Sequence, residues 1–301
     1  MGNISLGIMP AFSAGQITSR RWTVDFLQMC EDENIESVFT VEHVVVAKDY
    51  EPRYSYSESG RMPGRGDAVM PDPLELLAFY AACTEKVKLG TAVLVLTLHQ
   101  PAVVAKRVAT IDQLSNGRVL LGVGSGWQVE EYRACGVPYA GRGRRLDEAI
   151  VALRELWQPG HRTHLGEFFE FENCESIPQP VQAGGPPIII GGSTDIAARR
   201  TGRLGDGWYP YVISPDDYAI RGELIRRTAT ECGRNPDAIE FTAWPGSFKF
   251  GATTDLSMVR RYTDVPGTKR LVFSAQECGS SEVPQIRDFV RRIQDEIITK
   301  L

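Results

Sequence analysis

Short apolar runs alternate with longer segments whose apolar residues recur at helical spacing. In residues 18–35, Trp22, Phe26 and Cys30 fall on one face and Thr18 stands where an N-cap is expected. Residues 101–117 repeat the pattern, with a proline near the start and a glycine just past the end. Both segments are predicted to be helices that cover a core.

The apolar runs between these helices predict eight strands. Nearly all of them are apolar on both faces, which is typical of a parallel sheet covered by helices. Eight strand–helix units in about 300 residues favour a (β/α)8 barrel. We expect this barrel to form one domain over residues 1–301. The predicted strands are residues 4–10, 36–42, 87–96, 118–124, 186–192, 206–210, 239–248 and 268–275.

Two excursions interrupt the alternation. Residues 43–72 follow the second strand, on the face where barrel enzymes place their chemistry. Residues 158–185 precede the fifth strand and alternate like a small hairpin, which we expect outside the barrel. Loops of this length in a compact domain carry function or extra structure.

Composition narrows the class of protein. The chain is 43% hydrophobic and 24% charged, with a net charge of −5, so a general nucleic-acid or membrane-surface binder is not expected. Six scattered cysteines form no CxxC pair, and no apolar run is long enough to span a membrane. A cytoplasmic protein without a metal site is expected.

The ends of the second and third strands offer the first candidate residues. His43 follows Glu42 at the end of the second strand, where it would either serve as a proton donor or be held structurally by Glu42. The third strand is apolar through residue 96. This pattern fits either a strand of the barrel core or a wall behind a planar cofactor. His99, on the loop beyond, is expected to be exposed.

Glycines mark the ends of the fourth and fifth strands. Gly124 and Gly126 would either bring backbone close to a ligand or simply let the strand turn, and the dinucleotide fingerprint is absent. Gly191 and Gly192 precede Ser193, the expected N-cap of a helix whose free N–H groups suit a phosphate. An ordinary capped helix is the alternative.

These segments together resemble the bacterial luciferase-like family of flavin and deazaflavin oxidoreductases. The resemblance spans essentially the whole chain and is densest in residues 89–127, 136–157 and 186–210. Within the family, the loop "YEPRYSYSESGRMPGRGDAVMPDPL" is similar to that of the branch that uses coenzyme F420. FMN is the alternative cofactor.

The resemblance implies a ring at the barrel mouth, with a cis peptide at Ala92–Val93 behind it. It places the cofactor phosphate near Gly191–Ser193 and Gly124–Gly126, and it makes His43 an active-site histidine. We therefore predict His43 as catalytic. The predicted cofactor-binding residues are Glu42, Ala92, Val93, Gly124, Ser125, Gly126, Trp127, Gly191, Gly192 and Ser193.

Two further expectations concern charge at the mouth. Asp195 would repel a phosphate, so its side chain is predicted to point away from the mouth. An acidic oligoglutamate tail would need basic residues at the rim, for which the candidates are Arg53, Arg61, Arg65 and Arg133.

The expected function is hydride transfer between a deazaflavin and an organic small-molecule substrate, in a homodimer. Trp127 stands where the sugar-phosphate dehydrogenases of the family carry a glutamate, so a larger or more apolar substrate is expected. An FMNH2-dependent two-component monooxygenase and a non-catalytic flavin-binding protein are the alternatives. A phosphosugar isomerase or aldolase lacks an evident strand-end lysine.

Overall fold

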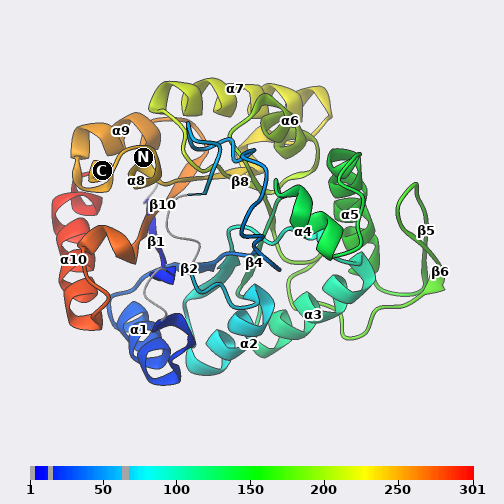
Figure 1. Ribbon diagram of the computed structural model, residues 1–301, viewed down its shortest axis with the longest axis horizontal. Coiled ribbons are helices and arrows are strands. Elements are labelled where there is room, and N and C mark those ends of the chain that lie inside the picture. Colours follow the sequence, from blue (N-terminus) through cyan, green and yellow to red (C-terminus); the bar gives the residue numbers. More distant parts are fainter. Residues whose placement is uncertain (1–3, 13–15, 63–67) are drawn as a thin grey trace.

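A computed structural model describes residues 4–12, 16–62 and 68–301. Eight parallel strands form a closed barrel in the order β1-β10-β9-β8-β7-β4-β3-β2, which confirms the predicted (β/α)8 fold. Helices surround this barrel (Figure 1). The barrel strands are β1 (Ser5–Met9), β2 (Ser37–Thr40), β3 (Lys88–Thr91), β4 (Val119–Val123), β7 (Ile188–Gly191), β8 (Gly207–Tyr209), β9 (Glu240–Ala243) and β10 (Thr268–Ser274).

Most helices lie where the sequence predicts them. The helices are α1 (Arg20–Asp32), α2 (Pro73–Cys83), α3 (Pro101–Leu114), α4 (Val129–Ala134), α5 (Arg142–Leu156), α6 (Asp195–Leu204), α7 (Pro215–Glu231), α8 (Pro245–Phe248), α9 (Leu256–Thr263) and α10 (Val283–Glu296). The helix over residues 129–134 was not predicted, and residues 245–248 are helical although they fall in the predicted strand 239–248. That strand ends at Ala243, because Pro245 opens a helical turn. The N-cap of α1 is Ser19 rather than Thr18, because a 3-10 turn ending at Thr18 precedes the helix.

Two apolar cores follow from this arrangement. The larger core fills the space between strands and helices. The smaller core fills the barrel interior, because every second side chain of a barrel strand points inward. Its buried members are Met9, Phe39, Leu120, Ile189, Tyr209 and Val272.

The segment before β7 forms the expected hairpin. Its strands β5 (Arg162–Leu165) and β6 (Glu170–Cys174) pair antiparallel in a sheet separate from the barrel. The hairpin projects beyond α5 (Figure 1).

The third strand differs from its prediction. Regular pairing of β3 ends at Thr91 instead of continuing to Leu96, and the Ala92–Val93 peptide is cis, as the resemblance implied. Leu94 then rejoins the sheet at one position, donating to the carbonyl of Gly122 at 2.9 Å. The strand thus breaks where it reaches the carboxyl end of the barrel.

A buried ion pair ties the amino ends of the strands together. Arg270 of β10 is 3% exposed, and its Nε and Nη2 donate to Glu36 at 2.6 and 2.8 Å. Lys88 of β3 lies 2.9 Å from the same carboxylate. Burial raises the pKa of Glu36, but the hydrogen bonds and charge of Arg270 outweigh it and hold the pKa at about 2.

Replacing Glu36 should therefore destabilise the fold in a pH-dependent way. We expect Glu36→Gln to lower the free energy of unfolding at pH 7 by about 2–4 kcal/mol, since it leaves a buried guanidinium without its partner. The folded pKa lies below the unfolded one, so this stabilisation is complete above the unfolded pKa near 4.5 and disappears as the pH falls toward 2. Urea unfolding of both proteins across pH 2.5–7 measures the difference.

Glu231→Gln is the control, because its ion pair with Arg227 is exposed on both sides. The expected change is about 0.5 kcal/mol or less. Equal losses in the two variants would show that the Glu36–Arg270 pair does not stabilise the barrel.

Candidate active site at the barrel mouth

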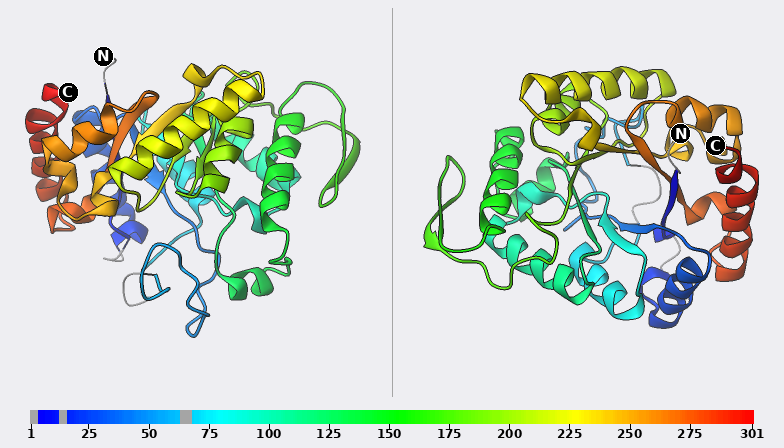
Figure 2. Two further views of the ribbon diagram at one scale, coloured as in Figure 1. Left: turned by 90° about the horizontal axis from the view of Figure 1, so that it is seen from above. Right: turned by 180° about the vertical axis from the view of Figure 1, so that it is seen from behind.

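The carboxyl ends of the eight strands lie together at one end of the barrel, which we call the mouth. Its floor is the top of the barrel core, against which Val41, Ala92 and Trp244 pack while partly exposed. In the left view of Figure 2, the loop after β2 (blue) and α4 (green) extend beyond the same end of the barrel. The loop after β2 and the β4–α4 connection therefore flank the mouth.

His43 forms a buried pair with Glu131 at the mouth. Its Nδ1 lies 3.0 Å from Oε2 of Glu131, a residue in the first turn of α4. Oε1 of the same carboxylate accepts the backbone N–H of Val44 at 2.7 Å. The His43 side chain is 10% exposed and that of Glu131 is fully buried. A carboxylate only accepts, so Nδ1 donates and Nε2 of the neutral ring is left as an acceptor.

The partner of His43 is thus Glu131 and not Glu42, the structural partner considered from sequence. Sequence reasoning missed Glu131 because it examined the residue directly after the strand-4 glycines, which is Trp127. The available signal was the Glu130–Glu131 pair opening the next helix, one helical turn beyond.

Glu42 supports the third strand. Its Oε2 accepts the backbone N–H of Val95 at 2.6 Å, and its Oε1 lies 2.9 Å from Nε2 of His99. The expectation that His99 is exposed is wrong, because this bond holds its side chain at 19% exposure. Both Glu42 oxygens have partners within the protein, which gives this predicted cofactor-binding residue a positioning role.

Glycines let the Ala92–Val93 segment sit close to β4 and β7. A Cβ on Gly124 would lie 2.6 Å from Cγ2 of Val93, and one on Gly191 would lie 2.6 Å from Cγ1. Neither distance is tolerated by real side chains. The two glycines thus make room for the Val93 side chain. Ala92 and Val93, which we call the wall, stay half-buried at the mouth.

The turn after β7 differs by one residue from its prediction. Thr194, not Ser193, is the N-cap of α6, and its hydroxyl accepts from Ala197 N at 3.2 Å. Gly192, at φ 106°, turns the chain two residues before the cap. Asp195 forms an ion pair with Arg221 of α7 at 3.1 Å, in agreement with its predicted orientation.

Aromatic rings connect the loop after β2 to the far side of the mouth. Trp127 makes edge-on contacts with His43, Tyr50 and Tyr54, with centroids 5.7, 4.9 and 5.1 Å away. The series continues through Tyr54–Tyr56, Tyr56–Tyr211 and Tyr211–Trp244. Sequence reasoning placed Trp127 at the site but gave no role to the tyrosines in "YEPRYSYS".

The predicted rim arginines have mixed surroundings. Arg53 pairs with Glu51, and Arg61 lies 5.2 Å over the ring of Tyr50. Arg133 is exposed, and Arg65 lies outside the described residues. Arg53 and Arg61 therefore already have partners within the loop.

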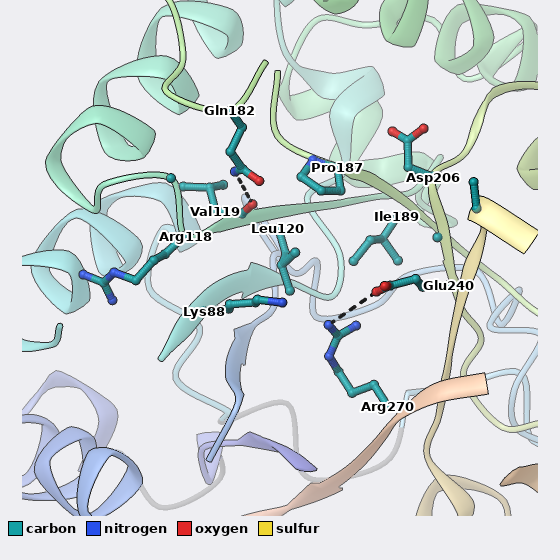
Figure 3. A pocket seen from close by; sticks show the side chains of 13 residues that line it. Lys88, Arg118, Val119, Leu120, Gln182, Pro187, Ile189, Asp206, Glu240 and Arg270 are labelled. Atoms are coloured by element: carbon teal, nitrogen blue, oxygen red, sulfur yellow. Dashed lines mark hydrogen bonds and ion pairs between the residues drawn. The ribbon is translucent and has the colours of Figure 1, made fainter. Parts of the chain in front are cut away.

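A cavity of about 240 Å³ lies at the opposite end of the barrel (Figure 3). Charged residues line it, but they bond within the protein. Arg118 donates to the carbonyls of Val87 and Thr84, and Asp206 accepts from Ile188 N and Arg154. We place the candidate site at the mouth, because the His43–Glu131 pair and the half-buried wall are there.

The chain matches the family described as luciferase-like monooxygenase over residues 14–260. The chain belongs to that family. The predicted family and the prediction of an enzyme are thereby confirmed, and the site above is the mouth of a luciferase-like barrel.

Curated relatives match part of the chain. An uncharacterized protein of Mycobacterium tuberculosis is 36% identical over 166 residues, which is 52% of this chain and 58% of that protein. An FMNH2-dependent dimethylsulfone monooxygenase of Pseudomonas putida is 39% identical over 155 residues, 50% of this chain and 42% of that protein. The match thus spans about half the length of these relatives.

Solved structures share the fold over nearly the whole chain. The coenzyme F420-dependent tetrahydromethanopterin reductase of Methanopyrus kandleri has a TM-score of 0.74 at 15% identity and covers 99% of both chains. The oxygenating constituent of 3,6-diketocamphane monooxygenase from Pseudomonas putida, in complex with FMN, has the same TM-score at 15% identity, covering 100% of this chain and 99% of its own.

We find no candidate membrane-spanning helix among residues 4–12, 16–62 and 68–301. None of their helices combines the length and apolar character that crossing a bilayer requires.

Glu42 should matter more for stability than an exposed glutamate. We expect Glu42→Gln to lower the free energy of unfolding by about 1–3 kcal/mol, because the new amide cannot accept from both Val95 N–H and His99. Glu167→Gln, whose ion pair with Arg144 is exposed, should change it by about 0.5 kcal/mol or less. Chemical unfolding measures both, and similar losses would refute the positioning role of Glu42.

Proposed function

We propose that the protein is a coenzyme F420-dependent oxidoreductase that transfers a hydride between the deazaflavin and an organic substrate. The observation that carries the proposal is the buried His43–Glu131 pair beside the half-buried wall at Ala92–Val93. Such a site joins an apolar surface for a planar ring with one group able to exchange a proton.

The residues at the mouth fit a ring that carries one phosphate. Ala92 and Val93 would back the ring. Ser193, at the turn before α6, would meet the phosphate with its hydroxyl and backbone N–H, and Ser125 lies on the neighbouring strand end. Asp195 does not oppose this placement, because its carboxylate pairs with Arg221.

When bound, the deazaflavin would supply or accept a hydride. Glu131 fixes the His43 ring and its tautomer, so that Nε2 takes up or returns the substrate proton. Trp127 and the tyrosines of the loop after β2 would limit water at the mouth and favour an apolar or planar substrate. One proton-exchanging group is enough for this chemistry, because one proton accompanies each hydride that the substrate gains or loses.

An FMNH2-dependent monooxygenase is the second candidate. It is favoured by the dimethylsulfone monooxygenase of Pseudomonas putida, which is 39% identical over the matched 155 residues. The same wall and the same turn would hold FMN, since both cofactors present a ring and one phosphate. The two candidates differ in their need for dioxygen, which a deazaflavin does not activate.

Cofactor titration and a His43 variant test the proposal together. Coenzyme F420 should bind in the micromolar range and more tightly than FMN, as followed by absorbance and by quenching of tryptophan fluorescence. His43→Gln should keep this affinity and lower turnover about 100-fold or more, because it removes the proton-exchanging group.

His161→Gln is the matched control, because His161 is exposed on the segment before the hairpin. It should leave both binding and turnover unchanged. Tighter binding of FMN, with turnover that stops when dioxygen is removed, would establish the monooxygenase instead. The absence of micromolar binding by either cofactor would refute both candidates.

A further inference from the structure

One aromatic residue lies across the mouth from the wall. Trp244 directly follows β9, and its partly exposed indole packs on the small core inside the barrel, as Ala92 of the wall does. In the closed barrel, β3 and β9 are separated by β4, β7 and β8 in one direction and by β2, β1 and β10 in the other. The two strands therefore lie on opposite sides of the barrel, and so do Ala92 and Trp244 at its mouth.

The orientation of the Trp244 indole is fixed by Glu277. Nε1 of Trp244 donates to Oε1 of Glu277 at 2.8 Å, and the same oxygen accepts the backbone N–H of Ser274 at 2.9 Å. Glu277 belongs to a capping box at the end of β10, which holds its carboxylate in place. A Cβ on Gly246 would overlap Oε2 of this carboxylate, so the glycine leaves room for it. The polar edge of the indole is thus bonded within the protein.

A second ring, that of Tyr211, continues the surface of Trp244. The two rings lie 5.4 Å apart at an interplanar angle of 42°, and both residues are partly exposed. Tyr211 comes just after β8, which lies opposite β2 in the barrel, the strand that leads to His43. The side of the mouth across from His43 and the wall is therefore aromatic.

We propose that Trp244 is a specificity-determining residue that packs against an aromatic ring of the substrate, and that Glu277 positions it. The proposal rests on the proposed function, because it takes the wall as the place of the cofactor ring. A ring with one face on Ala92 and Val93 would turn its other face toward Trp244, and hydride transfer requires the substrate to touch that face. A planar aromatic group suits this place, because aromatic rings attract one another in stacked and edge-on contacts.

Binding of a planar probe to the cofactor-loaded protein tests the proposal. The probe is 2-naphthol, its non-planar counterpart is decahydro-2-naphthol, and calorimetry measures both dissociation constants in protein saturated with coenzyme F420 or FMN, whichever binds. The unchanged protein should prefer 2-naphthol. Trp244→Ala should weaken binding of 2-naphthol about tenfold, because a ring–ring contact and its buried area are lost. Trp244→Phe should recover most of this loss, and the affinity for the cofactor, followed by absorbance, should stay unchanged in both variants.

Phe250→Ala is the matched control. Phe250 is 76% exposed on the turn that follows α8, so its removal should leave the affinities for probe and cofactor unchanged. Thermal unfolding and circular dichroism verify that each variant is folded. An equal loss of 2-naphthol binding in Phe250→Ala and Trp244→Ala would contradict a specific role of Trp244.

Variants of Glu277 test its positioning role. Glu277→Ala should weaken binding of 2-naphthol about threefold, because the indole loses its acceptor. Glu277→Gln should keep the affinity, since its amide oxygen still accepts from Nε1 of Trp244. Combining Glu277→Ala with Trp244→Ala should add no further loss, because Glu277 acts through the indole. Additive losses would show that Glu277 does not act through Trp244.

The remaining outcomes separate this inference from the proposed function. Unchanged binding of 2-naphthol by Trp244→Ala, or no binding of 2-naphthol by the loaded protein, would overturn the inference and leave the proposed function intact. Weaker cofactor binding by Trp244→Ala would also overturn it, because Trp244 would then contact the cofactor rather than the substrate. Failure of both cofactors to bind the unchanged protein would refute the proposed function and the inference together.

Discussion

Closure of the parallel sheet between β1 and β10 is the constraint on which the site depends. The two strands pair in register from Ser5–Arg270 to Met9–Ser274, so the last strand returns beside the first. All eight carboxyl ends then lie at the same end of the barrel. Side chains distant in sequence meet there, such as His43 and Glu131, which are 88 positions apart.

The position of the mouth's apolar wall follows from close packing within that barrel. Val93 occupies space that Gly124 and Gly191 leave open, and Glu42 anchors the chain beyond it through Val95 N–H. The wall is thus held from the ends of β4 and β7 and from the segment that follows β2. A planar ligand would meet a surface that is already in place, which lowers the entropy lost on binding.

Local pattern sufficed for the barrel, the hairpin and the place of His43, because strand and helix periods are encoded in neighbouring residues. The resemblance added the cis peptide at Ala92–Val93. The sequence could not predict contacts between distant loops. The pairing of His43 with Glu131, and of Glu42 with His99, depends on which strand ends the folded barrel brings together. The N-cap of α6 was missed by one residue, because the positive φ of Gly192 is not visible in the sequence.

A crystal structure of the protein with FMN or coenzyme F420 tests the central claim most directly, because it locates both ring and phosphate. The account predicts the ring against Ala92 and Val93, with His43 beside it. It also predicts the phosphate at Ser193, in the turn between β7 and α6. A phosphate bound elsewhere, such as in the cavity at the opposite end of the barrel, would contradict it.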